Sequence, residues 1–234
     1  MSVWAVIPLK SPESAKSRLR GVLDGQQRLR LFYALARRVI DATLHTPGID
    51  GVSVVTASDA VVDFAISLGA QCLRLESDRG TADACSEALE KLPAHCVKRV
   101  LFIAGDIPLV SSRVLAPFVA LSDHSPVVAI AADRRQIGTN ALLCAPGHAI
   151  PLCFGSGSFA QHVAAAARLG ITTHVVDSEP LALDIDEPDD LREWQSRLIQ
   201  TGQPMALALG HPVGQPLDAE LSDLFAARKE AVRQ

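Results

Sequence analysis

Short apolar runs alternate with amphipathic stretches along most of the chain. The short runs are typical of buried strands, and the stretches between them carry apolar side chains at helical spacing. Expected strands cover residues 3–8, 51–56, 71–75, 100–104, 127–132, 140–145 and 172–177. Expected helices cover residues 26–44, 59–68, 81–92, 111–121, 158–169 and 189–199. This alternation predicts βαβ units and therefore a three-layer α/β/α domain around a mainly parallel, mixed sheet.

The pattern changes near residue 201, where the sequence becomes TGQPMALALGHPVGQP and is rich in glycine and proline. A last amphipathic stretch, residues 217–232, then predicts a helix. We therefore expect one domain over residues 1–200 and an appendage over residues 201–234.

Composition narrows the class of protein. The chain has 234 residues, of which 48% are hydrophobic and 21% charged, with a net charge of −4, as in an ordinary globular protein. No apolar run approaches the ~20 residues of a membrane span, and the first residues carry no targeting signal. The five cysteines form no CxxC pair, which argues against a disulfide framework or a structural zinc site. We expect a cytoplasmic protein that neither spans nor binds a membrane.

The apolar run 100–104 ends abruptly in Gly105 and Asp106. Ligands of open α/β sheets bind at the carboxyl ends of the strands. An unpaired carboxylate is costly there, and a metal ion is a strong partner for it. The alternative is that Asp106 caps the next helix or forms an Asx turn.

A second acidic motif, Leu183-Asp184-Ile185-Asp186, follows far downstream. Carboxylates at i and i+2 of an extended segment point to the same side. Together with Asp106 they would form an oxygen-rich site suited to magnesium. The alternative is that these residues stabilise the N-terminus of the next helix, where acidic residues and proline are favoured. This explains Glu187 and Pro188 but not Asp184, which lies too far upstream to cap the helix.

The loop after the first expected strand is basic, with Lys10, Lys16 and Arg18 close together. Three cations at this position can neutralise a triphosphate and a departing pyrophosphate. The alternative is a solvated surface loop. Nucleic acid is a poor fit, because the protein is acidic overall and only 4% of its residues are aromatic.

A glycine-rich stretch, residues 154–159 (FGSGSF), opens the expected helix 158–169. Backbone amides at such a position can bind a phosphate or carboxylate against Gly155 and Ser158, although Ser158 could also be an ordinary N-cap. Thr139 lies in a similar polar turn before a strand. His162, one turn into the helix, is interpreted as a helix-face residue rather than a ligand.

Five stretches taken together resemble the CofC-type guanylyltransferases of coenzyme F-420 biosynthesis, which have the nucleotide-diphospho-sugar transferase (GT-A-like) fold. The stretches occur in order and span about residues 3–199. They are residues 7–19, 105–109, 138–142, 154–159 and 183–186.

The resemblance implies that GTP and a small phosphorylated acid react to give a guanylylated product and pyrophosphate. The acceptors of the family are 2-phospho-L-lactate, phosphoenolpyruvate and 3-phospho-D-glycerate. It implies that Asp106, Asp184 and Asp186 hold Mg²⁺. It further implies catalytic or nucleotide-binding roles for Pro8, Lys10, Lys16, Arg18, Gly105 and Asp106, acceptor binding by Thr139, Gly155 and Ser158, and a plausible homodimer.

The sequence departs from the family at the Gly-Leu-Asn stretch that normally recognises the guanine base. The corresponding residues here are Arg79-Gly-Thr-Ala-Asp83. Gly80 matches the glycine of the family, and Asp83 can substitute for the asparagine. Alternatives are transfer of another nucleotide on the same fold, as in molybdenum-cofactor or cytidylyl enzymes, and a non-catalytic nucleotide-binding module.

Overall fold

The computed structural model describes residues 3–124 and 126–201. In this part of the chain the strands form one seven-stranded sheet with the order β3-β2-β1-β4-β6-β5-β7. Only β6 runs antiparallel to its neighbours within that sheet. The strands are β1 Val3–Pro8, β2 Ile49–Thr56, β3 Gln71–Arg74, β4 Val100–Ile103, β5 Val127–Ala132, β6 Thr139–Ala145 and β7 Thr172–Val175.

Helices connect most of these strands, as the periodicity predicts. Helix α1 begins at Gly25 because Asp24 and Gln27 form a reciprocal capping box that satisfies its first backbone N–H groups. The α-helices are α1 Gly25–Leu44, α2 Asp59–Ser67, α3 Thr81–Lys91, α4 Ser112–Ala120, α5 Ser158–Arg168, α6 Glu179–Ala182 and α7 Pro188–Thr201. Three short 3₁₀ helices are η1 Ser17–Leu19, η2 Cys96–Lys98 and η3 Leu121–His124.

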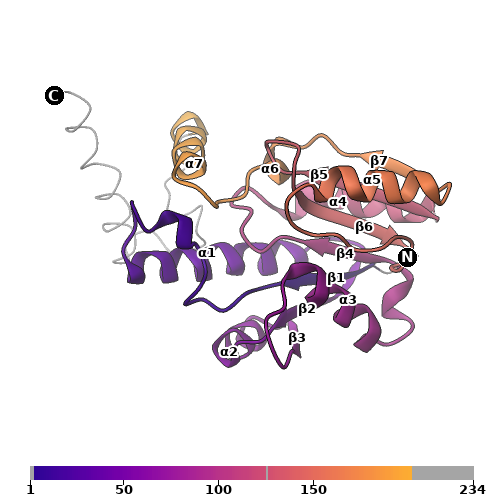
Figure 1. Ribbon diagram of the computed structural model, residues 1–234, viewed down its shortest axis with the longest axis horizontal. Coiled ribbons are helices and arrows are strands. Elements are labelled where there is room, and N and C mark those ends of the chain that lie inside the picture. The colour runs from indigo at the N-terminus through magenta and orange to yellow at the C-terminus, as the bar shows by residue number, and fades with distance from the viewer. Residues whose placement is uncertain (1–2, 125, 202–234) are drawn as a thin grey trace.

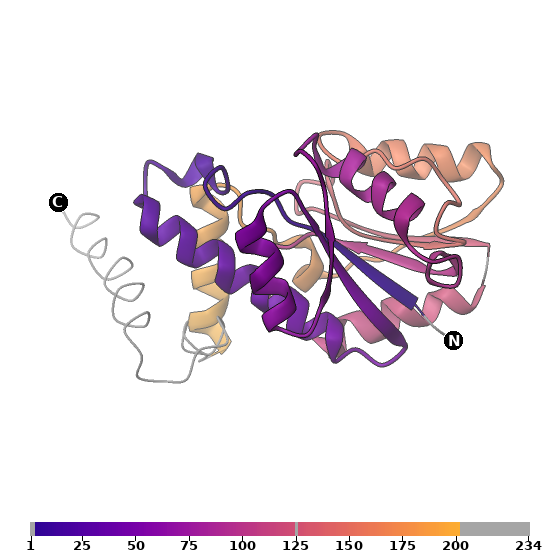
Figure 2. The same cartoon turned by 90° about the horizontal axis from the view of Figure 1, so that it is seen from below.

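The helices cover both faces of the sheet and make three layers (Figures 1 and 2). Apolar side chains of α1, α2 and α4 pack against one face, and those of α3 and α5 pack against the other. Alternate strand residues supply the two cores, since successive side chains point to opposite faces. Leu101 and Ile103 of β4 belong to the first core, whereas Val100 and Phe102 belong to the second.

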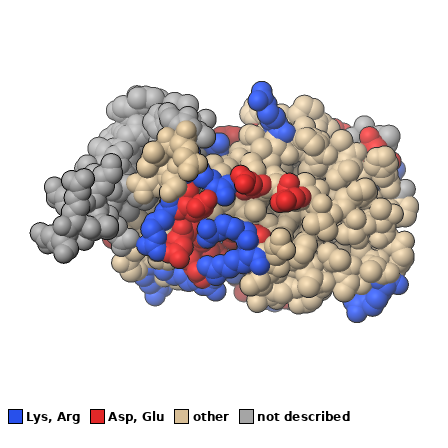
Figure 3. Space-filling model, turned by 90° about the horizontal axis from the view of Figure 1, so that it is seen from above, with Lys and Arg blue, Asp and Glu red and all other residues tan. Residues whose placement is uncertain are grey.

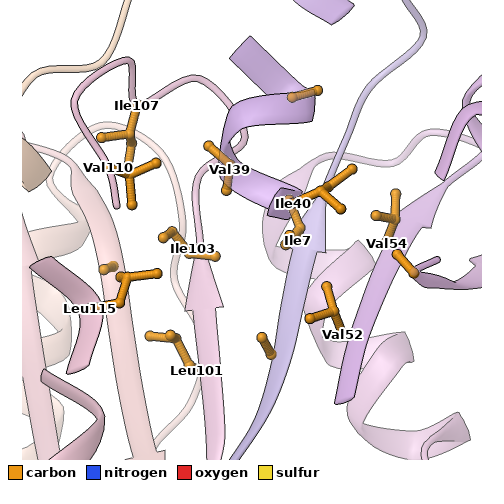
Figure 4. Close-up of a cluster of buried hydrophobic side chains, with 14 of the residues drawn as sticks. Ile7, Val39, Ile40, Val52, Val54, Leu101, Ile103, Ile107, Val110 and Leu115 are labelled. Atoms are coloured by element: carbon orange, nitrogen blue, oxygen red, sulfur yellow. The ribbon is translucent and has the colours of Figure 1, made fainter. Parts of the chain in front are cut away.

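The first core is the larger of the two, and Figure 4 shows its centre. Ile7 and Val54 from adjacent strands lie beneath Val39 and Ile40 of α1. Because β4 is apolar on both faces, it occupies the middle of the sheet. The residues that follow β4 are thereby held rigidly at the centre of one sheet edge.

A third cluster joins the N-terminal half of α1 to α7, beyond the end of the sheet (Figure 2). Trp194 of α7 packs there with Leu31 and Leu35 of α1, and Leu183 and Ile185 belong to the same cluster. Burial of Leu183 and Ile185 leaves the intervening residue, Asp184, between two anchored side chains.

The predicted α/β fold class is confirmed. Each expected strand and helix of residues 1–200 begins and ends within two residues of the observed one. The antiparallel strand follows from a short connection, residues 133–138, between β5 and β6, which is too short for a crossover. Helix α6 and the 3₁₀ helices were not expected. The predicted appendage 201–234 and its helix 217–232 lie, apart from Thr201, outside the described residues. No helix among the described residues combines the length and apolar character needed to cross a membrane.

Substitution of Trp194 tests how far the domain depends on the third cluster. Its side chain is 1% exposed, and its indole Nε1 has no hydrogen-bond partner in the part of the chain that the structure describes. We expect Trp194→Ala to lower the free energy of unfolding by about 3–5 kcal/mol, because a large cavity is left. Trp194→Phe should cost far less, and equal losses for the two variants in urea denaturation would contradict this account.

Candidate active site

Lys16 is the centre of the candidate site. It lies just before η1 with a left-handed backbone (φ 54°), and its side chain is only 6% exposed. Its Nζ lies 2.5 Å from Oδ2 of Asp106 and 3.2 Å from Oδ1 of Asp186. Burial alone would lower the pKa of Lys16, but the charges and hydrogen bonds of the two carboxylates outweigh it and raise that pKa. The ammonium is therefore charged and joins three segments distant in sequence.

The segment 183–186 is fixed beside the end of β4 by its backbone as well. The N–H of Ile185 donates to the carbonyl oxygen of Asp106 over 3.2 Å. Because this segment is not helical and Ile185 is buried, Asp184 and Asp186 both face the side of the cleft. The sequence-based expectation that the two acidic motifs meet at one sheet edge agrees with this arrangement.

Asp184 is held by Asn140, a residue that sequence reasoning did not select. The buried Asn140 amide donates to the carbonyl oxygens of Leu181 (2.9 Å) and Ala182 (3.2 Å) and to Oδ1 of Asp184 (3.2 Å). Burial, followed by the charge of Asp106, raises the pKa of Asp184 to about 7. The site therefore carries more negative charge than Lys16 neutralises.

A continuous cleft runs past these residues. Its main pocket, of about 410 Å³, is shared by the basic loop and the acidic residues. A neighbouring hollow shares Arg18 and Asp186 with it, and a third shares Pro8 and Lys10. The main pocket is lined by five predicted nucleotide-binding residues and by two of the predicted metal ligands: Pro8, Lys10, Lys16, Arg18 and Gly105, and Asp106 and Asp186.

Gly105 keeps the main pocket open at the end of β4. A Cβ atom at this position would lie 2.2 Å from Cδ2 of Leu9, which is far inside van der Waals contact. Any larger residue would therefore displace Leu9 from the wall of the pocket.

At the end of the cleft expected to bind the guanine base, Asp83 does not lie where the sequence predicted. Gly80 lines the third hollow, as does Asp78, whose Oδ1 accepts a hydrogen bond of 3.0 Å from the Gly80 N–H. Asp83 is exposed in the first turn of α3 and does not belong to that lining. A guanine-reading role for Asp83 stays a prediction, and Asp78 is the carboxylate nearer to the cleft.

The predicted acceptor residues form a second group, which does not line the three hollows described above. Oγ of Ser158 lies 3.0 Å from Oγ1 of Thr139, so the first residue of α5 is bonded to the first residue of β6. Ser158 is therefore not an ordinary N-cap; the cap position is taken by Gly157. Gly155, with φ +120°, has a backbone conformation that few other residues adopt.

His162 connects this second group to the preceding loop. It is 0% exposed, so it lies on the buried face of α5. Its Nδ1 lies 3.1 Å from Oγ1 of Thr139, and its Nε2 accepts a 2.9 Å hydrogen bond from the Cys153 N–H. Burial lowers the pKa of His162 to about 4, so the ring is neutral at physiological pH.

Ion pairs lie along the rim of the cleft. Arg18, which is 67% exposed, pairs with Glu187 at 3.5 Å, and Arg135 donates to the same carboxylate. Arg134 pairs with Asp190 at 2.8 Å, and Oδ2 of Asp190 accepts hydrogen bonds from the N–H groups of Asp186 and Glu187, just before α7. Figure 3 shows a face of the molecule on which acidic and basic side chains are interleaved in one area.

The donor set fits a hard divalent cation in its chemistry. Asp106, Asp184 and Asp186 offer only carboxyl oxygens, which are the ligands that such a cation prefers. No group of three or more acidic, histidine or cysteine side chains in residues 3–124 and 126–201 is already arranged as a metal site. Instead, the ammonium of Lys16 contacts two of the three carboxylates.

Comparison with known proteins shows which family the chain belongs to. Residues 3–198 match the protein family described as "Guanylyl transferase CofC like". The chain belongs to this family. Curated relatives include the phosphoenolpyruvate guanylyltransferase of Rubrobacter xylanophilus, 38% identical over 196 residues, which are 84% of this chain and 95% of the relative.

Relatives of the CofC-like chain differ in the acceptor that they are named for. The 2-phospho-L-lactate guanylyltransferase of Methanothermobacter thermautotrophicus is 32% identical, with 82% of this chain and 84% of the relative covered. The 3-phospho-D-glycerate guanylyltransferase of Colwellia psychrerythraea is also 32% identical, over 80% and 88% of the two chains. A solved structure named as a nucleotide-diphospho-sugar transferase of Desulfovibrio desulfuricans covers 98% of this chain and 97% of its own, with a TM-score of 0.72 at 13% identity. This likeness confirms the predicted fold.

The burial of His162 predicts a specific pH dependence of stability in this CofC-like protein. The folded-state pKa of about 4 is below the ordinary 6.5, so the unfolded chain binds a proton that the folded one excludes. We compare the free energy of unfolding of wild type with that of His162→Gln. The difference in favour of wild type should be greatest above pH 6.5 and should fall by up to about 3 kcal/mol as the pH falls towards 4. Urea denaturation of both proteins across this range measures it, and a constant difference would contradict the buried neutral ring.

Proposed function

We propose that this protein transfers GMP from GTP to a small phosphorylated carboxylic acid and releases pyrophosphate. Candidate acceptors are phosphoenolpyruvate, 2-phospho-L-lactate and 3-phospho-D-glycerate. The observation that carries the proposal is the cleft in which Lys10, Lys16 and Arg18 meet Asp106 and Asp186. Cations suit a triphosphate, whereas the carboxylates would repel it without a further cation. Membership of the guanylyl transferase family supports the proposal.

The reaction needs little proton chemistry. An oxygen of the acceptor phosphate, already ionised at neutral pH, attacks the α-phosphorus of GTP. A new phosphoanhydride bond forms there, and the bond from the α-phosphorus to the oxygen that bridges to the β-phosphorus breaks. Pyrophosphate leaves with that oxygen, so catalysis consists of positioning and charge neutralisation.

Residues of this chain divide that work. Lys10 and Lys16 would bind the triphosphate and stabilise the departing pyrophosphate, and the exposed Arg18 at the rim would assist. Thr139, Gly155 and Ser158 would bind the acid groups of the acceptor at the start of α5, where the helix dipole favours an anion. Gly80 and Asp83 would lie on the base side.

Magnesium would be held by Asp106, Asp184 and Asp186 and would supply charge neutralisation of the phosphate oxygens when bound. The ammonium of Lys16, which contacts Asp106 and Asp186 in the same cleft, would bind phosphate oxygens. We also propose that the protein acts in coenzyme F-420 biosynthesis in the cytoplasm, as a homodimer.

Pyrophosphate release tests the proposal directly. Purified protein is mixed with GTP and Mg²⁺ and with each of the three acceptors in turn, with CTP and ATP replacing GTP in parallel. We expect release with GTP and at least one acceptor, and loss of release in excess EDTA because the phosphate charge is no longer neutralised.

Release with CTP or ATP in preference to GTP would replace guanylyl transfer by another nucleotidyl transfer on the same fold. Absence of release in every combination, together with GTP binding seen by calorimetry, would favour a non-catalytic nucleotide-binding module.

The acidic residues are tested by Asp106→Ala and Asp184→Ala. Each should lower kcat at least about 100-fold, because electrostatic stabilisation at the reacting phosphates is lost. Asp63→Ala, which removes an exposed carboxylate of α2, is the matched control and should keep wild-type turnover. Circular dichroism checks that each variant is folded, and near-native turnover of either site variant would remove the metal assignment.

A further inference from the structure

We propose that His162 is a positioning residue that sets the direction of the hydrogen bonds at the acceptor site. In this role it makes the Thr139–Ser158 hydroxyl pair a donor towards the anionic group of the acceptor. The inference deepens the proposed function and rests on it. It follows from four hydrogen-bonding groups and the number of hydrogens that they share.

The first step is the state of the ring. His162 is 0% exposed and packs edge-on against Phe154, with ring centroids 5.2 Å apart. A buried imidazole without a carboxylate partner is neutral, in keeping with its lowered pKa. One ring nitrogen therefore carries the proton and the other accepts a hydrogen bond.

The second step fixes which nitrogen that is. The Cys153 backbone N–H can only donate, and it lies 2.9 Å from Nε2 of His162. Nε2 is therefore the acceptor, and the proton of the neutral ring is on Nδ1. Nδ1 then donates to Oγ1 of Thr139 over 3.1 Å.

The third step counts the hydroxyl hydrogens. Thr139 and Ser158 have one each, and their oxygens share a single hydrogen bond of 3.0 Å. That bond uses one hydrogen, and the His162 contact uses neither, because the ring supplies its own. One hydroxyl hydrogen is left over, and it has no partner among the protein groups described for either side chain.

The opposite tautomer would remove that donor. If Nε2 carried the proton, Nδ1 would accept from the Thr139 hydroxyl, and the Ser158 hydroxyl would in turn donate to Thr139. Both hydrogens would then be consumed inside the protein. Phosphate and carboxylate groups only accept hydrogen bonds, so the tautomer decides whether the hydroxyl pair attracts or repels the acceptor.

The location of the pair makes the extra donor useful. Ser158 is 0% exposed and donates to Thr139, which is only half-buried, so the remaining hydroxyl hydrogen belongs to the more accessible of the two side chains. Ser158 opens the eleven-residue helix α5, and the preceding Gly157 leaves its N-terminus without a side-chain cap. The donor therefore adds to a positive helix end, where an acidic acceptor is favoured.

Steady-state kinetics with the acceptor found above test the inference. His162→Leu removes both ring hydrogen bonds, and we expect the KM for the acceptor to rise roughly 10- to 100-fold while the KM for GTP changes less than about twofold. His162→Gln offers a carbonyl oxygen to the Cys153 N–H and an NH₂ group to Thr139, and should restore the acceptor KM to within about threefold of wild type.

Arg168→Gln, on the exposed last turn of α5, is the matched control and should leave both KM values unchanged. Thermal melts establish that the variants are folded. If wild type is active and His162→Leu has a normal acceptor KM, or raises both KM values equally, the inference is wrong while the proposed function stands. If wild type is inert with every acceptor, the proposed function fails and takes this inference with it.

A second readout does not depend on turnover. Two-bond ¹H–¹⁵N correlation spectra of histidine-labelled protein, assigned by the loss of a signal in His162→Gln, report the tautomer directly. We expect a protonated Nδ1 and an unprotonated Nε2, which is the minor neutral tautomer of a free histidine side chain. A protonated Nε2 in the folded protein would overturn the inference whatever the kinetics.

Discussion

The ion pairs of Lys16 with Asp106 and Asp186 are the constraint on which the rest of the site depends. They tie the loop after β1 to the end of β4 and to the segment before α7, which are separated by 90 and 170 positions in the sequence. The ammonium offsets the repulsion between the carboxylates of Asp106 and Asp186, and the neighbouring Asp184 has a pKa raised to about 7 chiefly by its burial. The same ammonium is also the group that phosphate would attract.

Besides this ion group, the structure contains the two groups of residues that we propose bind anions. The wide cleft carries lysines and carboxylates, as charge-neutralised triphosphate chemistry requires. The start of α5 instead offers hydroxyls and a helix end, and no charged side chain takes part in the hydrogen bonds of Thr139, Ser158 and His162. Asn140 links the two, since it follows Thr139 and binds Asp184.

Periodicity predicted the fold well because apolar spacing is a local property of the sequence. It located β4 and the aspartate that follows it, Asp106, and the interrupted pattern at Gly105 indicated the sheet edge where we propose that the chemistry takes place. The pairing of Lys16 with two carboxylates depends on contacts across the chain, so the sequence indicated only that cations and acids share an edge. His162 and Asn140 were missed because their roles follow from backbone partners, the Cys153 N–H and the Leu181 carbonyl, which no residue pattern encodes.

The mass of the reaction product tests the central claim most directly. GTP labelled with ¹³C in the ribose is incubated with the protein, Mg²⁺ and an unlabelled phospho-acid, and the products are separated and weighed by mass spectrometry. Guanylyl transfer predicts a labelled product with the mass of GMP plus acceptor minus one water, together with unlabelled pyrophosphate. Labelled GDP with free phosphate, or unchanged GTP with every acceptor, would contradict it.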